Sequence, residues 1–357
     1  MNSPLDLLRA RGVSRRDFMK LCAAVTAAMG LPAAMEPEVA KAVEAGIKKP
    51  AVIWLEGQDC AGCSESTIAT LNPSAAEVVL DMLSLRYHET IMAGTGDVAR
   101  KAFEDTVKEG KYVLVVEGSI PKENDKFCVI GGKPFRQHVE EAAKNAAVIL
   151  AIGSCAAYGG IPGATPSKGV GVGEIVKDKP IINLPSCPVK PSRLIGTIVY
   201  YLTFKKAPEL DNVGRPKAFY SNNIHENCPR RGQFESGHFL NDWNDPQQAD
   251  WCLLLKGCKG PKTFADCGQV WWNDNVNYCI NAGSPCAGCS QPEFYKEFSP
   301  LYKKQEMFSL PGVGQVNPDT VGKIVAGATA VGIAAHLGGS AVSGRLGNDH
   351  KSKEVSK

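Results

Sequence analysis

Short apolar runs bounded by glycine or proline recur along the first half of the chain. They lie at residues 51–55, 111–118, 147–153 and 179–185. Runs of this length that are apolar throughout are typical of strands buried on both faces of a sheet. Helix-like stretches, among them 72–85 and 134–145, separate these runs. The alternation predicts an α/β fold, in which helices cover both faces of a parallel sheet.

Three of the predicted strands run into a cysteine. The first is followed by Cys60, the third by Cys155 and the fourth by Cys187. In open α/β sheets, ligands gather beyond the carboxyl ends of the strands. We therefore expect these three thiols to meet at one edge of the sheet.

The residue composition and the hydrophobic periodicity change after about Pro191. Aromatic residues, proline, glycine and asparagine dominate there, and regular periodicity fades. Such a region is held together by bound cofactors more than by a large core. The pattern predicts one domain over residues 48–190 and a second, irregular domain over residues 191–311.

Near the C-terminus, the 19 residues 324–342 include no Asp, Glu, Lys or Arg and are rich in Ala, Gly, Val and Ile. This length just reaches that of a membrane-spanning helix. The Lys and Arg residues that follow favour a cytoplasmic C-terminus. We expect a hydrophobic anchor helix over 319–343 and a polar tail over 344–357. A surface helix that lies on a partner is the alternative.

The N-terminus carries the run Ser14-Arg15-Arg16-Asp17-Phe18, and an apolar stretch over 21–34 follows it. Twin arginine before a modest apolar segment predicts a twin-arginine signal peptide, here over residues 1–45. A basic turn before an ordinary core helix is the alternative. Because this route exports folded proteins to the periplasmic side of the cytoplasmic membrane, cofactors can be inserted first, in the reducing cytoplasm. The cysteines are therefore better interpreted as metal ligands than as disulfide partners.

Composition narrows the classes of function. The chain has 357 residues, of which 44% are hydrophobic, so a buried core is expected. Its net charge of +3, from 40 basic and 37 acidic residues, gives no argument for nucleic-acid binding. Thirteen cysteines indicate disulfides, metal sites or both, and an odd number cannot all pair within the chain.

The first cysteine set joins the C-x-x-C pair Cys60 and Cys63 to Cys155 and Cys187. The pair presents two thiolates on one tight turn, and two more arrive from other strand ends. Together they make a four-thiolate site for a 4Fe–4S cluster. A redox disulfide or half of a zinc site is the alternative for the pair alone.

The second set contains one histidine and three cysteines: His225, Cys228, Cys252 and Cys258. Imidazole can replace thiolate in iron–sulfur ligation, and a neutral ligand should raise the reduction potential. Zinc is the alternative, because structural zinc sites also use three cysteines and a histidine.

The third set offers four thiolates within 23 residues: Cys267, Cys279, Cys286 and Cys289. A zinc ribbon is the alternative here. Two cysteines remain outside the sets. Cys22 lies in the predicted signal, and Cys128 is expected to be a small buried side chain.

In this order, the motifs resemble the small subunit of nickel–iron hydrogenases. The resemblance covers nearly the whole chain. It rests on the twin-arginine run and on six cysteine motifs, at residues 60–65, 153–160, 185–188, 224–229, 257–261 and 285–289.

The resemblance implies a flavodoxin-like N-terminal domain and a cluster-bearing C-terminal domain. It also implies a role for each set. The first set would hold the proximal cluster, nearest the active site, and the second would hold the distal cluster, near the surface. Cys267, Cys286 and Cys289 of the third set would hold the medial cluster.

The chain departs from the common family pattern at two places. Most members have proline in the fourth medial position and carry a 3Fe–4S cluster there. Cys279 stands at or within a residue of that position, as in the selenium-containing branch, which implies a medial 4Fe–4S cluster, with a 3Fe–4S cluster as the alternative. Oxygen-tolerant relatives have two extra cysteines at the proximal cluster, where this chain has Gly62 and Gly160. A standard, oxygen-sensitive enzyme is therefore implied, with a C-terminal anchor like that of membrane-bound uptake hydrogenases.

The reaction that the resemblance implies is the reversible splitting of dihydrogen into two protons and two electrons. It would occur at a nickel–iron centre in a separate large subunit, and no catalytic acid, base or nucleophile is expected on this chain. The chain would relay electrons to a membrane cytochrome or quinone-reducing subunit, or to a cytochrome c. The alternatives are a stand-alone multi-cluster ferredoxin-like carrier and a structural zinc or disulfide protein.

Overall fold

The chain forms two compact units, Met1–Lys304 and Gln305–Lys357. The computed structural model describes residues 19–20, 22–23, 26–27, 32–45, 50–71, 74–76, 78, 83–295, 308–310, 314–316 and 318–343. The twin-arginine run and the predicted polar tail lie outside the described residues.

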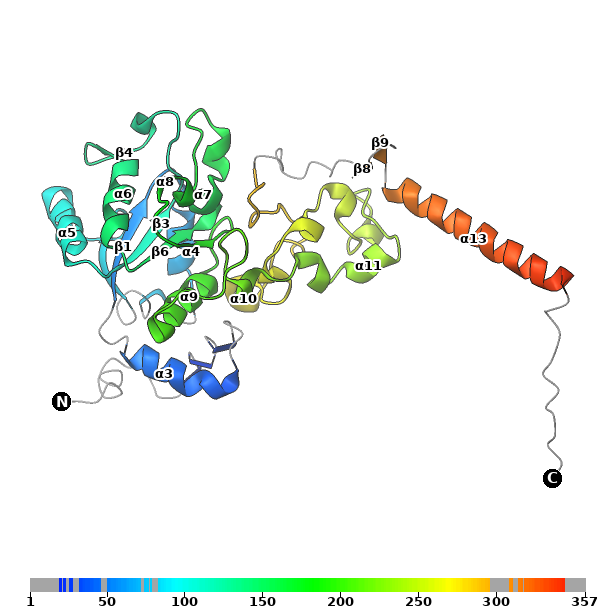
Figure 1. Cartoon of the computed structure of the whole chain (residues 1–357), viewed down its shortest axis with the longest axis horizontal. Coiled ribbons are helices and arrows are strands. Elements are labelled where there is room, and N and C mark those ends of the chain that lie inside the picture. The colour runs from blue at the N-terminus through cyan, green and yellow to red at the C-terminus, as the bar shows by residue number, and fades with distance from the viewer. Residues whose placement is uncertain are drawn as a thin grey trace, which may run out of the picture. The chain divides into compact units, whose positions relative to one another are not determined.

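A five-stranded parallel sheet forms the centre of the first unit (Figure 1). The strand order is β2-β1-β3-β6-β7, which is 2-1-3-4-5 when only these strands are counted along the chain. That order is the flavodoxin-like arrangement. The prediction of a parallel α/β sheet is confirmed, with strands β1 Ala51–Glu56, β2 Ser84–His88, β3 Val113–Glu117, β6 Val148–Ile152 and β7 Ile181–Leu184.

Strand β2 is the one strand of this five-stranded sheet that the sequence pattern did not predict. Ser84 and Leu85 belong to it, so the helix-like stretch expected over 72–85 is wrong at its end. β2 is an edge strand that pairs only with β1, and Arg86 is exposed between Leu85 and Tyr87. Because the prediction relied on runs that are apolar throughout, it overlooked a strand interrupted by a charge.

Neighbouring residues of the central strands face opposite sides of the sheet. On one side, β1 and β3 residues such as Val52 and Val115 pack with helix α9, Pro191–Phe204. On the other side, Ile53 and Leu114 share a core with helices α5, Gly96–Glu109, and α6, Phe135–Asn145. Helix α6 confirms the helix expected over 134–145.

Two short helices follow the ends of the central strands. Helix α4, Gly62–Ile68, comes after β1, and helix α7, Gly153–Tyr158, follows β6 directly. Cys60, Cys63 and Cys155 lie at these two strand ends and Cys187 follows β7, as the topology requires.

The region after α9 is built from short elements. They are helices α10 Lys217–Tyr220, α11 Arg231–Glu235 and α12 Trp272–Asn275, and 3-10 turns η5 Ile224–Asn227, η6 Pro246–Gln248, η7 Leu254–Lys256, η8 Gly260–Lys262 and η9 Asp266–Gly268. The remaining elements of the first domain are α8 Val172–Ile175, η3 Asp125–Phe127, η4 Ile161–Ala164 and the hairpin of β4 Val129–Ile130 and β5 Lys133–Pro134. Regular structure therefore declines after Phe204, the end of α9, and not at Pro191, where the sequence periodicity was expected to fade. The domain boundary near residue 190 stays a prediction.

Part of the predicted signal peptide packs on the sheet domain. Helix α3, Glu36–Ala45, follows the turn η1, Ala33–Met35, and lies against α9. Cys22 and Val39 are buried in the core that contains α9.

The second unit contains helix α13, Pro318–Val342, and the hairpin of β8 Phe308–Leu310 and β9 Gly314–Val316. Within α13, the 18 residues Val325–Val342 have a mean hydropathy of 1.4 and are not buried. By length and composition this helix could cross a membrane. It begins and ends one residue earlier than the predicted helix over 319–343.

Candidate metal centres

The four cysteines of the first set meet at the carboxyl ends of the strands. Cys63 lies in the first turn of α4, after Ala61 with its left-handed φ of 56°. Burial raises the pKa of Cys155 to about 12, and the nearby Cys187 and Cys60 thiols add to the rise. Burial also raises the pKa of Cys63, and Glu117 and the Cys155 and Cys187 thiols add to the rise. The structure thus brings together all four thiols that the sequence analysis grouped.

Glycines allow the backbone to approach these sulfur atoms. A Cβ atom on Gly153 would lie 2.5 Å from Cys63 Sγ, and one on Gly160 would lie 2.9 Å from Cys155 Sγ. Both glycines have positive φ, 75° and 48°. A larger residue at Gly153 or Gly160 would therefore be strained and would also crowd the sulfur.

The second set lines one small pocket. His225 belongs to η5, and Cys228, Cys252 and Cys258 lie around the same hollow. Burial lowers the pKa of His225, and Arg231 lowers it further, which favours the neutral imidazole that can bind a metal. Arg230 Nη1 donates to the carbonyl oxygens of Ala249 at 2.8 Å and Trp251 at 2.7 Å. The arginine thereby ties the segment before Cys252 to the turn after Cys228.

The third set also assembles. Burial raises the pKa of Cys289 to about 12, and Cys267 and Cys279 are among the neighbouring thiols that contribute. Burial raises the pKa of Cys286, and the nearby Cys258 and Cys289 thiols add to the rise. Cys279, the cysteine that departs from the common family pattern, therefore lies with the other three.

Direct contacts connect the three sets in a row. The Cys286 N–H donates to Cys258 Sγ at 3.3 Å, which joins the third set to the second. Ser154, next to Cys155, donates through Oγ to the Cys289 carbonyl, which joins the first set to the third. The nearby Cys187 thiol also adds to the raised pKa of Cys289. The spatial order is first, third, second.

The spacing of the sulfur atoms distinguishes between a single metal ion and a cluster. Zinc–sulfur bonds of about 2.3 Å in a tetrahedron would place the four ligand atoms roughly 4 Å apart. Among the described residues, only Glu56, Asp59 and Glu117 place three such ligand atoms within 4.8 Å of one another. The cysteine sets are therefore wider than a zinc site, which argues against the zinc alternatives.

The donor chemistry of the three sets fits iron–sulfur clusters. Each set offers four thiolates, or three and a neutral imidazole, and N–H groups point at the sulfur atoms. Val189 N–H donates to Cys63 Sγ, and Arg193 Nη2 donates to Cys267 Sγ, both at 3.3 Å. None of the twelve cysteines from Cys60 onward forms a disulfide. Because burial disfavours free thiolates, bound iron would offset the electrostatic penalty of gathering them.

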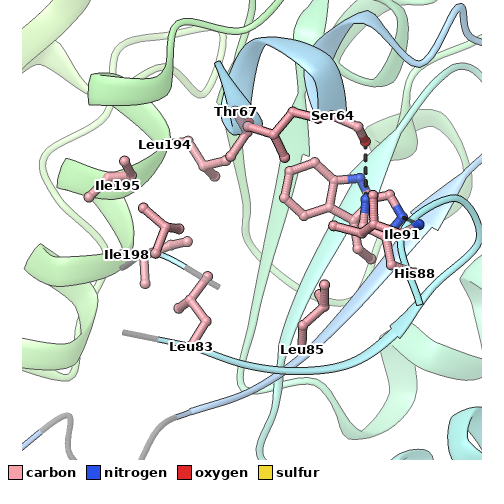
Figure 2. Close-up of a pocket in the computed structure, with 12 residues that line it drawn as sticks. Ser64, Thr67, Leu83, Leu85, His88, Ile91, Leu194, Ile195 and Ile198 are labelled. Carbon is pink, nitrogen blue, oxygen red and sulfur yellow. Dashed lines mark hydrogen bonds between the residues drawn. The ribbon is translucent and has the colours of Figure 1, made fainter. Parts of the chain in front are cut away.

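A hydrogen-bonded network that the sequence analysis missed lies beneath the first set. Glu117 accepts hydrogen bonds from Cys63 N at 2.9 Å, Ser64 Oγ at 2.6 Å and Trp54 Nε1 at 3.1 Å. Ser64 also contacts His88 Nε2 at 3.1 Å, as Figure 2 shows at one end of an apolar pocket between α4, β2 and α9. Burial raises the pKa of Glu117.

The sequence did contain a signal for this network. Two buried strands, β1 and β3, each end in a glutamate, and these two glutamates are paired in register, Glu56 with Glu117. A carboxylate at the end of an apolar run is expensive to bury without partners. Sequence reasoning also missed Arg193 and Asp266, which are ordinary surface residue types by composition alone.

A hollow of about 980 Å³ adjoins the first set. Its lining includes Gly62, Lys190, Trp271 and Trp272. Ile68 and Leu71 nearby in the chain are 45% and 69% exposed. The surface beside the first set is therefore concave and partly apolar, as a docking face for another protein would be.

Two protein-family models match the chain. The C-terminal part of the NiFe/NiFeSe hydrogenase small subunit matches residues 220–302. The 20 Kd subunit of NADH ubiquinone oxidoreductase matches residues 60–201.

Curated relatives match almost from end to end. The uptake hydrogenase small subunit of Azotobacter vinelandii is 41% identical over 350 residues, which are 96% of each chain. The hydrogenase-1 small chain of Escherichia coli K12 is 37% identical over 98% of this chain and 94% of its own.

Solved hydrogenase structures also contain chains that are similar to this one. A chain of the Dm. baculatum [NiFeSe]-hydrogenase is 33% identical, with a TM-score of 0.67 over 72% of this chain and 99% of its own. A chain of the Desulfovibrio vulgaris Hildenborough [NiFeSe] hydrogenase is 35% identical, with a TM-score of 0.66 over 71% and 98%. These matches favour the small-subunit prediction over a stand-alone carrier. The chain belongs to the family of nickel–iron hydrogenase small subunits.

Proposed function

We propose that this chain relays electrons between a hydrogenase large subunit and an external acceptor through three 4Fe–4S clusters. Dihydrogen would be split into two protons and two electrons at the nickel–iron centre of that partner. When bound, the clusters would accept and release electrons one at a time. The proposed ligands are Cys60, Cys63, Cys155 and Cys187 for the proximal cluster, Cys267, Cys279, Cys286 and Cys289 for the medial cluster, and His225, Cys228, Cys252 and Cys258 for the distal cluster.

The observation that carries this proposal is the row of contacts between the sets. Ser154, next to Cys155, donates to the Cys289 carbonyl, and the Cys286 N–H donates to Cys258 Sγ. Each set is thus joined to the next by a hydrogen bond. A structural metal site needs no such neighbour, whereas an electron relay needs its sites close together.

The proposed large-subunit face is the hollow beside the proximal set. Cys60 and Cys187 are exposed in the chain alone, although they belong to a set whose other two members are more buried. A partner that covers the hollow would exclude water from them. The exposed apolar side chains of Ile68 and Leu71 would be buried in the same interface.

We further propose that the chain is exported folded to the periplasmic side of the cytoplasmic membrane and is anchored there by α13. The twin-arginine run and the apolar composition of Val325–Val342 support this location. The distal set would then pass electrons to a membrane cytochrome or quinone-reducing subunit, or to a cytochrome c. Replacing Arg15 and Arg16 by lysine should leave the loaded enzyme in the cytoplasm, and unchanged periplasmic activity would contradict this location.

Cys279→Ala tests the cluster assignment. With one thiolate removed, the medial site should keep three irons, so the purified complex should lose one iron atom and gain the paramagnetic signal of an oxidised 3Fe–4S centre. Cys128→Ala is the matched control, because Cys128 belongs to none of the sets and should change neither readout. Iron content that is unchanged in Cys279→Ala would show that Cys279 is not a ligand.

A further inference from the structure

We propose that Arg193 raises the reduction potential of the medial cluster, and that Asp266 holds the guanidinium in place for this task. The inference rests on the proposed function, since it concerns the cluster bound by the third set. Arg193 would be a positioning and tuning residue, because it acts on the cluster through the ligand Cys267.

Arg193 reaches the third set from inside the protein. It lies on α9 and its side chain is fully buried, at 0% exposure. Its Nη2 donates to Cys267 Sγ at 3.3 Å. Its Nε donates to Asp266 Oδ1 at 3.1 Å, and Nη2 also contacts that oxygen. The guanidinium is therefore fixed by the residue immediately before the cysteine that it contacts.

The charges around Asp266 do not balance. Lys190 Nζ lies 3.5 Å from Asp266 Oδ1, and Lys190 and Asp266 are only 5% and 10% exposed. Asp266 thus faces two basic side chains, and its single charge cannot neutralise both. An arginine guanidinium is not deprotonated in proteins, so Arg193 carries its charge into this buried site.

A second arginine lies close to the third set. Arg193 and Arg215 both lie over the Tyr220 ring, with their Cζ atoms 4.9 Å and 5.3 Å from its centroid. Arg215 is paired with Asp211 at 2.7 Å. It also donates through Nη1 to the carbonyl of Ser290 at 3.0 Å, next to Cys289. Because Asp211 neutralises Arg215, the positive charge that Asp266 leaves unbalanced lies at Arg193 and Lys190.

The arrangement has a definite electrostatic consequence. Reduction adds one negative charge to a cluster. A fixed cation and an N–H···S hydrogen bond both stabilise that added charge, and in a buried site the stabilisation is weakly screened. Arg193 supplies both to Cys267 at once.

The fourth thiolate, from Cys279, explains why a raised reduction potential at the medial cluster is useful. A fourth thiolate makes the medial site more negative than a three-thiolate site, which disfavours reduction. Electrons that enter from the proximal cluster would then meet an uphill step. A buried guanidinium beside the same set would reduce this unfavourable difference in reduction potential without removing the ligand.

The test is an EPR-monitored redox titration of the purified complex of both subunits, in wild type and in Arg193→Gln. At a fixed potential, the ratio of reduced to oxidised medial cluster should fall about tenfold in the variant. For a one-electron couple, a tenfold change corresponds to about 59 mV. The proximal and distal clusters should shift less.

Three companion variants separate tuning from folding. Arg193→Lys keeps the charge and should recover most of the wild-type ratio. Asp266→Asn removes the negative charge but keeps a side-chain oxygen that can accept from Arg193, so the guanidinium stays in place and the ratio should change in the opposite direction. Arg136→Gln is the matched control, because Arg136 is also paired with an aspartate, Asp125 at 2.8 Å, but lies on α6 on the other face of the sheet.

The outcomes are distinct for the two proposals. An unchanged medial potential in Arg193→Gln, with all iron retained, would overturn the role of Arg193 and leave the relay standing. If Arg193→Gln fails to assemble, a downward or unchanged potential in Asp266→Asn overturns the role, and an upward shift supports it. A wild-type complex without a medial cluster would overturn both the relay and this inference.

Discussion

The two halves of the first unit are stabilised in different ways. In the sheet half, strands β1, β3 and β6 bury nearly every side chain and pack between helices on both faces. In the half after α9, described elements are helices and 3-10 turns of three to five residues, and cysteines form much of the interior. The comparison indicates that apolar burial stabilises the first half and that bound iron stabilises the second.

Removal of iron should give the largest difference between the halves. When iron is chelated from the reduced complex, amides such as Ile224 N–H, bonded to the Thr263 carbonyl at 2.8 Å, should exchange at least about a hundredfold faster. Amides of β3 and β6 should change little. Hydrogen exchange followed by mass spectrometry measures both, and equal acceleration in the two halves would remove the distinction.

A matched pair of leucine truncations should have the next largest effect. Leu114→Ala, in β3 at 0% exposure, should lower the free energy of unfolding by about 3 kcal/mol without loss of iron. Leu253→Ala, at 2% exposure and lining the pocket of the second set, should instead lose iron from that set. Denaturant unfolding and iron analysis of both variants test the pair. Iron loss confined to Leu114→Ala would contradict the comparison.

Protonation of Glu89 should make the stability of the sheet half depend on pH. Burial raises the pKa of Glu89 from 4.5 to about 8. The folded state therefore holds this proton more tightly than the unfolded state, and its contribution to stability is lost as pH rises from about 4.5 to about 8. The slope is at most about 1.4 kcal/mol per pH unit.

Glu89→Gln should flatten this dependence, while the exposed control Glu104→Gln should leave it unchanged. Denaturant midpoints measured from pH 5 to pH 8 provide the comparison. Parallel curves for Glu89→Gln and wild type would show that Glu89 carries no such proton.

The smallest effect is expected on the solvent side of the sheet half. Asp97 pairs with Arg100 at 2.8 Å on α5, but both side chains are exposed, at 91% and 66%. Water screens such a pair, so Asp97→Ala should change the free energy of unfolding by about 0.5 kcal/mol or less. A change above about 1 kcal/mol would mean that surface charge contributes more to this half than its apolar core implies.

The sequence predicted the features that follow from local patterns. Continuous apolar runs identified β1, β3, β6 and β7, and the cysteines after them identified the first set. Strand β2 was missed because Arg86 interrupts it at the edge of the sheet. The distinction between zinc and clusters also needed the structure, because ligand spacing in space is not encoded in sequence spacing.

Contacts between distant segments that no strand end or cysteine motif marks could not be predicted. Arg193 and Cys267 are 74 residues apart, and Glu117 and Cys63 are 54 apart. Nothing local in the sequence around Arg193 distinguishes it from an exposed helix residue. Only the packing of α9 against the turn η9 places its charge against a sulfur.

The metal content of the native, anaerobically purified particle tests the central claim most directly. Three four-iron clusters and one active-site iron predict about thirteen iron atoms per nickel, with no zinc. About twelve iron per nickel would contradict the role of Cys279, and twelve without nickel would leave a bare electron carrier. Zinc in place of iron would contradict the relay altogether.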